Sequence, residues 1–171
     1  SGSMCGKRIE EARKTAVLLN EAVRGISNLE YYCYGFTSNS GCVEMSVYSE
    51  NGSGKCSKYA LGNIKDDGGT PTGMAMLVAQ ERIRAKTKSQ CVMFVVTDGE
   101  PDNEQYVVLA REKCKKDNIT VIGVDIRGVE VTMKRLFENV VSIRDMSTLA
   151  LSISTILKKY VKKLKIKDSL R

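Results

Sequence analysis

The sequence predicts an α/β fold, arranged as a three-layer sandwich around a mainly parallel sheet with one antiparallel edge strand. Two observations support this fold class. Segments with apolar residues every three or four positions alternate along the chain with short apolar runs, as helices and strands would. One of those runs, 91–96, is apolar without alternation, which is typical of a parallel strand buried on both faces, and 120–126 is predicted to be a second buried strand. Right-handed helical crossovers would connect such strands.

The first third of the chain predicts one helix and two strands. Residues 7–26 carry apolar side chains at helical spacing, which indicates a helix with one buried face. Residues 31–36 are rich in aromatic residues and predict a strand, and residues 43–48 alternate as in a half-buried strand. Asn51 and Gly52 form a turn signal. The polar, glycine-rich stretch 51–69 is expected to be a loop with little regular structure.

A helix is predicted to begin in the sequence GGTPTG, with Thr70 as its N-cap and Pro71 in its first turn. After the 91–96 strand, Asp102 or Asn103 is placed to cap a helix that runs to about Lys116. Val107, Ala110 and Cys114 form the buried face of that helix.

The rest of the chain completes the alternation of helices and strands. A short helix is expected over 130–137 and a short last strand over 140–143. The segment 153–164 predicts a final helix, with an apolar stripe docked on the sheet and its lysines exposed to solvent, and a membrane-surface or anion-binding helix is the alternative.

Composition narrows the chemistry available to a chain of 171 residues, a length that fits one domain. The absence of histidine excludes serine-histidine-aspartate triads and zinc sites of the cysteine-histidine type. Six cysteines without a CxxC pair favour reduced thiols and a cytoplasmic protein, with a Cys42 to Cys56 bridge as the alternative. No apolar run is long enough to cross a membrane, and no membrane association is expected.

The formal net charge of +7 is concentrated at the end of the chain. Residues 156–171 contain seven Lys or Arg and one Asp, so this tail contributes +6 and the other 155 residues contribute +1. Those residues carry no basic stripe interleaved with aromatics, the pattern typical of single-strand binders. No nucleic-acid partner is therefore expected.

Three polar stretches are expected to meet at the carboxyl ends of the strands, where open parallel sheets bind ligands. They are the N-terminal SGSM, the GGTPTG loop and the TDGEPD that follows the 91–96 strand. Together they offer the hydroxyls of Ser1, Ser3 and Thr70 and the carboxylate of Asp98. Such an all-oxygen set with little charge suits Mg²⁺ or Mn²⁺ and leaves the ion able to accept a further oxygen.

Each of these residues also has a purely structural interpretation. SGSM is also the kind of sequence left by a cleaved purification tag. Thr70 fits a helix N-cap, Asp98 followed by Gly99 fits a turn, and Asp102 fits a helix cap better than a ligand. The metal-site hypothesis therefore depends on the combination and order of the motifs.

SGSM before a long helix, then GGTPTG, then an apolar strand ending in TDGEPD resembles a von Willebrand factor A domain. The metal-ion-dependent adhesion site of that family is written Asp-x-Ser-x-Ser, then a Thr, then an Asp. By this resemblance Ser1 and Ser3 match the two serines, Thr70 matches the threonine and Asp98 matches the second aspartate. The resemblance implies a Rossmann-like fold that holds Mg²⁺ or Mn²⁺, with a Glu or Asp of a partner completing the coordination.

One part of the family pattern is absent from this sequence. The first aspartate of the motif should stand two residues before Ser1, at the end of a central hydrophobic strand. The sheet would then lack its middle, between the strand at Tyr31 and the strand at Cys91. We therefore expect residues 1–171 to be a single domain of this type, truncated at its N-terminus and part of a longer protein.

The leading functional hypothesis is a metal-dependent protein-interaction module that is not an enzyme. The resemblance is to the intracellular bacterial branch of the family, and it implies a cytoplasmic protein whose partner is an AAA-type ATPase or a chelatase subunit. A second hypothesis is a nucleotide-binding or phosphoryl-transfer enzyme that uses the GGTPTG loop and Asp98. The sequence GSGKCS at 52–57 superficially resembles a phosphate-binding loop, but it lacks the required glycine spacing and the Ser or Thr after its lysine. A third hypothesis is a structural domain with a degenerate metal site.

Overall fold

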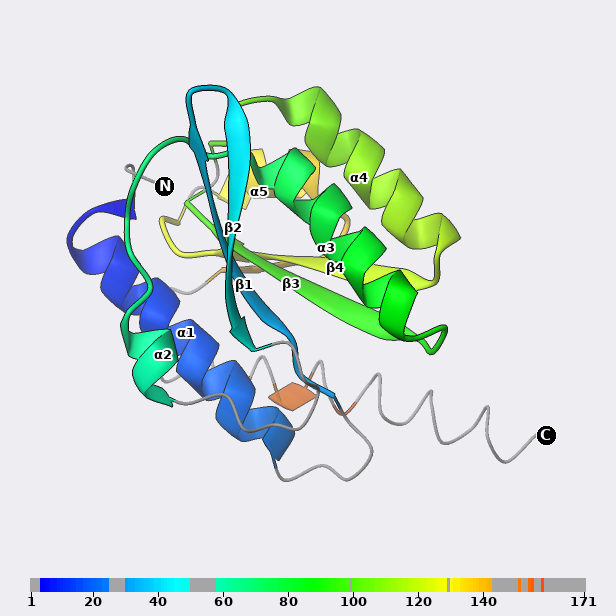
Figure 1. The fold of residues 1–171 in the computed structure, drawn as a ribbon, viewed down its shortest axis with the longest axis horizontal. Helices are drawn as coiled ribbons and strands as arrows, with labels where there is room; N and C mark the ends of the chain where they lie inside the picture. Colours follow the sequence, from blue (N-terminus) through cyan, green and yellow to red (C-terminus); the bar gives the residue numbers. More distant parts are fainter. Residues whose placement is uncertain are drawn as a thin grey trace.

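Helices and strands alternate along the chain in the predicted order (Figure 1). A computed structural model describes residues 4–24, 30–49, 58–98, 100–128 and 130–142, and four residues between 151 and 158. The predicted final helix, 153–164, lies almost entirely outside the described residues. The elements are α1 (Lys7–Arg24), β1 (Cys33–Asn39), β2 (Cys42–Ser49), α2 (Lys58–Gly62), α3 (Thr72–Lys86), β3 (Cys91–Thr97), α4 (Glu104–Lys116), β4 (Ile119–Asp125), α5 (Glu130–Leu136) and β5 (Val140–Ser142).

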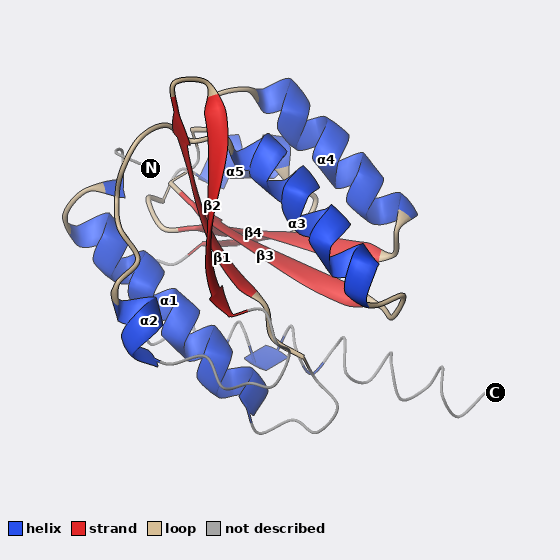
Figure 2. Ribbon diagram, in the orientation of Figure 1, coloured by secondary structure: helices blue, strands red, loops and turns tan. Residues whose placement is uncertain are grey.

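The strands form two sheets, as Figure 2 shows. β1 and β2 make an antiparallel pair, and β3, β4 and β5 make a parallel sheet in that order. Both the parallel arrangement and the antiparallel strand were predicted. Within the described part of the chain no strand joins β1 to β3, so the described strands fall into two separate sheets.

Ser40 and Gly41 form the turn that joins β1 to β2. This turn was not predicted from the sequence. Their φ angles are 50° and 80°, and the pair Asn39 and Cys42 flanks them. Two consecutive positive φ values are the signature of a two-residue hairpin turn whose twist matches that of the strands. The predicted turn at 51–52 lies outside the described residues.

α1 covers one face of the parallel sheet. Its buried face is the predicted one, and the side chains pack against β3 and β4. Phe94 and Val96 of β3 and Val124 of β4 point to this side. Tyr31 donates a hydrogen bond from its hydroxyl to the Ala16 carbonyl (3.2 Å) and packs on the same cluster, and β1 begins only at Cys33. The cluster contains Met4, Ile9, Ala12, Leu19, Val23, Val124 and Ile126.

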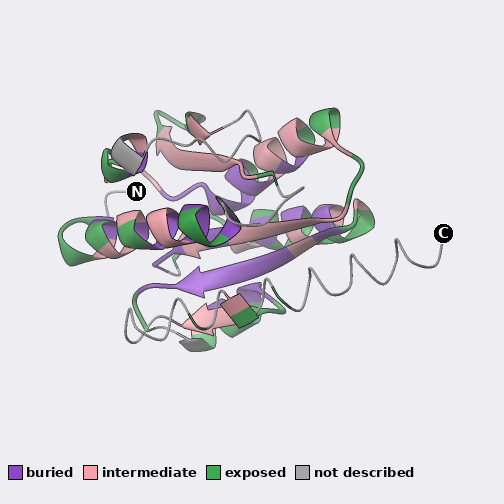
Figure 3. Ribbon diagram, turned by 90° about the horizontal axis from the view of Figure 1, so that it is seen from below, coloured by how far each residue is buried: buried purple, intermediate pink, exposed green. Residues whose placement is uncertain are grey.

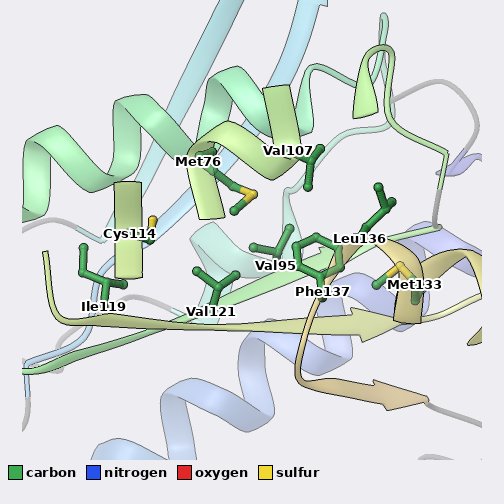
Figure 4. Close-up of a cluster of buried hydrophobic side chains, with 10 residues drawn as sticks. Met76, Val95, Val107, Cys114, Ile119, Val121, Met133, Leu136 and Phe137 are labelled. Carbon is green, nitrogen blue, oxygen red and sulfur yellow. The ribbon is translucent and has the colours of Figure 1, made fainter. Parts of the chain in front are cut away.

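α3, α4 and α5 cover the opposite face (Figure 4). Val95 and Val121 point to this side, since successive residues of a strand face opposite ways. The predicted buried face of α4 is confirmed, because Val107, Ala110 and Cys114 are fully buried. Two apolar layers on one parallel sheet make the three-layer sandwich that the sequence predicts. The cluster contains Met76, Val95, Val107, Ala110, Cys114, Ile119, Val121, Met133, Leu136 and Phe137.

β3 is less buried than its sequence suggests. The prediction was a strand buried on both faces, yet its first four residues are half-buried, whereas β4 is buried at every position except Thr120 (Figure 3). β4 has a hydrogen-bonded neighbour on each side, and β3 has one among the described strands. The difference in burial therefore follows from the division of the sheet.

One further local prediction is corrected. Residues 51–69 were expected to lack regular structure, but α2 forms one and a half helical turns within them, with Leu61 fully buried. The burial of Leu61 favours a short helix, which the polar composition of residues 51–69 did not indicate. Cys42 carries a free thiol, and Cys56, its partner in the alternative disulfide, lies outside the described residues. Among the described residues, no helix combines the length and apolar character needed to span a membrane.

Candidate metal centre

Asp98 lies directly after β3, and the N-terminal end of α1 approaches it. Arg8, in the first turn of α1, places its Nη1 atom 3.7 Å from Oδ2 of Asp98. The start of the first helix and the carboxyl end of β3 are therefore neighbours. Ser1 and Ser3, the two candidate ligands that precede this helix, lie outside the described residues.

Thr70 is held beside the loop that follows β3. Its backbone N–H donates to Oδ1 of Asp102 (2.7 Å), and its carbonyl accepts from the backbone N–H of Asp102 (2.9 Å). The Ser38 hydroxyl of β1 donates to the other oxygen of Asp102 (3.3 Å). Asp102 thus joins the GGTPTG loop, the tip of the hairpin and the loop that carries Asp98.

The predicted capping roles of Thr70 and Asp102 are wrong. α3 begins at Thr72 with Pro71, which has no side-chain acceptor, in the capping position and no side-chain cap. α4 is capped by the second candidate, Asn103, whose Oδ1 accepts from the backbone N–H groups of residues 105 (2.9 Å) and 106 (3.3 Å). Asp102 is left to hold the loops together.

Glycine is required where the GGTPTG loop meets the hairpin. Gly68 has a φ of 59°, and a Cβ there would collide with the Ser38 carbonyl and the Thr37 hydroxyl. A Cβ on Gly69 would collide with the Ser38 hydroxyl and lie 2.9 Å from Oδ2 of Asp102. The absence of side chains at these two glycines lets the backbone of the loop approach the hairpin closely, and this approach positions Thr70.

Asp98 is fully buried, and no described residue donates a hydrogen bond to either of its carboxylate oxygens. Asp125, at the end of the neighbouring strand, is equally buried but accepts from the N–H groups of Arg127 and Gly128 (both 2.9 Å) and from the Ser142 hydroxyl (3.2 Å). Buried polar groups in folded proteins are almost always paired. The contrast between the two aspartates indicates that the Asp98 oxygens are available to a ligand that is itself a cation or a donor.

The chemistry of the described donors suits a hard divalent ion. A hydroxyl and a carboxylate are oxygen ligands, which Mg²⁺ and Mn²⁺ prefer over the nitrogen and sulfur ligands of softer metals. No group of three or more Cys, Asp or Glu side chains in the described residues could hold a metal by itself. An ion at Asp98 would therefore need hydroxyl and water ligands, as the predicted set provides.

Most backbone amides of the GGTPTG loop already donate to groups within the protein. The N–H of Gly68 donates to Asp67 Oδ1, that of Gly69 to the Ser38 carbonyl, that of Thr70 to Asp102 and that of Thr72 to the Thr70 carbonyl. Proline at 71 has no N–H. Phosphate loops need amides that point at the ligand, so this geometry disfavours the nucleotide hypothesis. GSGKCS lies outside the described residues.

Sequence reasoning missed two residues of the site, Arg8 as the neighbour of Asp98 and Asp102 as the link between loops. Arg8 lies on the polar side of an amphipathic helix, where a charged side chain is normally expected to point into solvent. Asp102 contacts residues 32 and 64 positions away. Contacts at such separations have no local sequence signal.

The comparisons with known proteins show the family and the fold of this chain. The family model of the von Willebrand factor type A domain matches residues 1–160. The chain belongs to this family. No curated protein matches the sequence.

Solved structures with the same fold share little sequence identity with this domain. An aerotolerance-related membrane protein from Bacteroides fragilis has a TM-score of 0.68 at 19% identity, over 93% of this chain and 94% of that one. The manganese-loaded TRAP protein of Plasmodium vivax has a TM-score of 0.61 at 13% identity, over 83% and 64%. Proximal thread matrix protein 1 of the mussel byssus, with a zinc-occupied metal-ion-dependent adhesion site, has a TM-score of 0.56 at 17% identity, over 92% and 43%. This domain therefore spans less than two thirds of the last two chains.

Proposed function

We propose that this domain is a protein-interaction module, and not an enzyme, that binds a partner carboxylate through a bound Mg²⁺ or Mn²⁺ ion. The observation that carries the proposal is the fully buried Asp98 carboxylate, which receives no hydrogen bond from the described residues. Family membership supports it, as do the manganese and zinc named for two proteins of the same fold.

In this proposal the ion is held by Asp98 and by the hydroxyls of Thr70, Ser1 and Ser3. With one carboxylate among four ligands, the ion keeps most of its positive charge and attracts a Glu or Asp of the partner. The protein's own residues do the positioning. Asp102 fixes the Thr70 backbone, and Gly68 and Gly69 let the loop close on the hairpin.

The ligand role of Thr70 is tested by two substitutions of similar size. Thr70→Val removes the hydroxyl and keeps the shape, whereas Thr70→Ser keeps the hydroxyl. Calorimetric titration with Mn²⁺ is expected to show binding to the original protein and to Thr70→Ser, and at least about tenfold weaker binding to Thr70→Val. Losing a ligand of a bound cation costs roughly 1.5–3 kcal/mol, as for hydrogen bonds to charged groups. Equal affinities for the serine and valine variants would contradict the assignment.

The carboxylate step has a separate test. Bound Mn²⁺ accelerates the relaxation of water protons, and this effect falls when a peptide oxygen replaces a coordinated water. A short peptide with a central glutamate is expected to lower the relaxation of the Mn²⁺-loaded domain, and the same peptide with glutamine is not. If both peptides act alike, the domain does not recognise a carboxylate through its metal.

We also propose that a strand from outside residues 1–171 completes the sheet between β1 and β3. The support is that β1 and β3 each pair on one edge among the described strands, and unpaired edges are a liability in folded proteins. The Mn²⁺ titration is therefore run twice, on this chain and on one lengthened upstream by about ten to fifteen residues, enough for one strand and its connection. Tighter binding by the longer chain is expected, and equal binding would count against the added strand.

Within the same proposal the partner is an AAA-type ATPase or a chelatase subunit of a bacterial cytoplasm. The reducing setting is supported by Cys5 and Cys42, which are exposed and carry free thiols. Oxidising compartments tend to convert such exposed thiols to disulfides. The partner class follows from the resemblance of the motifs alone.

The cytoplasmic setting predicts a pattern of thiol labelling. Alkylation of intact cells with a membrane-permeant reagent, followed by peptide mass spectrometry, is expected to label Cys5 and Cys42. Cys114 is expected to resist, because burial raises the pKa of its thiol to about 11 and the thiolate is the reactive form. Cys114 should react once the protein is unfolded in urea. Disulfide-bonded Cys5 or Cys42 in cells would place the protein in an oxidising compartment.

A further inference from the structure

Arg8 is the ion-pair partner that the described residues provide for Asp98. The two side chains differ in exposure: 38% for Arg8 and 1% for Asp98. A buried carboxylate that lacks hydrogen-bond donors is costly unless a nearby charge compensates it. At 3.7 Å, the partly exposed guanidinium provides part of that compensation.

We infer that Arg8 is the built-in counterion of the metal-free site and competes with the divalent ion for Asp98. The inference rests on the proposed function, since it concerns the same carboxylate. A divalent ion bound to Asp98 would lie within a few ångströms of the guanidinium, and like charges at that separation repel strongly near a protein surface. Because Arg8 is partly exposed and has a long flexible stem, it can turn into water when the ion binds. Arg8 therefore sets the metal affinity of the site.

Lys7 provides a matched control one residue away. Its side chain is 91% exposed and forms an ion pair with Glu11 at 3.9 Å. Arg8→Gln and Lys7→Gln change the net charge of the protein equally, but only the first removes the charge beside Asp98. Charges in open solvent are screened by salt, so Lys7 should have little effect on an ion bound at Asp98.

The first experiment is calorimetric titration of the full chain with Mn²⁺ at physiological ionic strength. Arg8→Gln is expected to bind Mn²⁺ at least about tenfold more tightly than the original protein, and Lys7→Gln within about twofold of it. Equal affinity, or weaker binding by Arg8→Gln, would overturn the inference. A similar gain in both variants would also overturn it, because the effect would then come from net charge.

The second experiment needs no metal. In the presence of a chelator, urea denaturation of Arg8→Gln, Asp98→Asn and the double variant gives the coupling between the two side chains. We expect the unfolding equilibrium constant of the double variant to differ by about tenfold from the value obtained by multiplying the effects of the two single variants. The same cycle with Lys7→Gln is expected to show no coupling.

The two experiments separate the failure of the inference from that of the proposed function. Mn²⁺ binding without coupling between Arg8 and Asp98 in chelator would leave the proposed function standing and remove Arg8 from it. Coupling without Mn²⁺ binding to either the original protein or Arg8→Gln would overturn the metal function, and the competition with it. Binding of Mn²⁺ by Arg8→Gln but not by the original protein would support the inference most directly.

Discussion

Replacing Gly73 by alanine is expected to destabilise the domain by about 3 kcal/mol, within the upper range for overpacking of a closely packed site. Gly73 lies in the first turn of α3, and a Cβ there would stand 2.5 Å from the backbone nitrogen of Val107 and 2.6 Å from Cβ of Tyr106. Backbone atoms cannot rotate away as a side-chain tip can, so α4 must shift as a whole. Urea denaturation should show a lower midpoint with an unchanged slope.

The expected shift also affects the candidate site. Thr70 precedes α3, and Asp102 precedes α4, so the contact at Gly73 holds together the two loops that Asp102 joins. Gly73→Ala should therefore weaken Mn²⁺ binding even at temperatures where the variant is folded. Gly62→Ala is the control, because a Cβ at this exposed position meets nothing within 4 Å. Equal stability of the two variants would mean that α3 and α4 are not in tight contact.

Local patterns were sufficient to predict most elements of the fold. Apolar spacing identified the buried face of α1, and Val107, Ala110 and Cys114 on α4 are fully buried as expected. These predictions succeed because helix amphipathicity depends on neighbours three or four residues apart. The strands β3 and β4 were likewise predicted, from two mainly apolar runs separated by a helix.

The errors occur where distant residues decide the outcome. Thr70 is a residue type favoured at the N-cap, but Pro71 takes the capping position, and the Thr70 N–H donates to Asp102, 32 residues away. Arg8 belongs to a polar helix face and is drawn to Asp98, 90 positions later, by the burial of that carboxylate. Neither contact alters any short-range pattern in the sequence. The residues that position the candidate site could therefore be identified only from the three-dimensional fold.

Asp98→Asn is expected to have opposite effects with and without metal. In chelator it should stabilise the domain by about 1 kcal/mol, because replacing a buried charge that lacks hydrogen-bond donors by a neutral group of the same size removes a desolvation cost. The ion pair with Arg8 offsets only part of that cost, since the guanidinium is partly exposed. Thermal denaturation in chelator measures this change.

With Mn²⁺ present the order of stability should reverse. An ion at one hundred times its dissociation constant stabilises a folded protein by about 2.7 kcal/mol. Asp98→Asn should lose this gain, because removing the charged ligand is expected to weaken Mn²⁺ binding by at least about a hundredfold. Asp125→Asn is the contrasting variant: its carboxylate accepts three hydrogen bonds, so it should lose stability equally in chelator and in Mn²⁺. If Asp98→Asn were instead destabilising in chelator, its carboxylate would be a structural group like that of Asp125, and the metal-site assignment would fail.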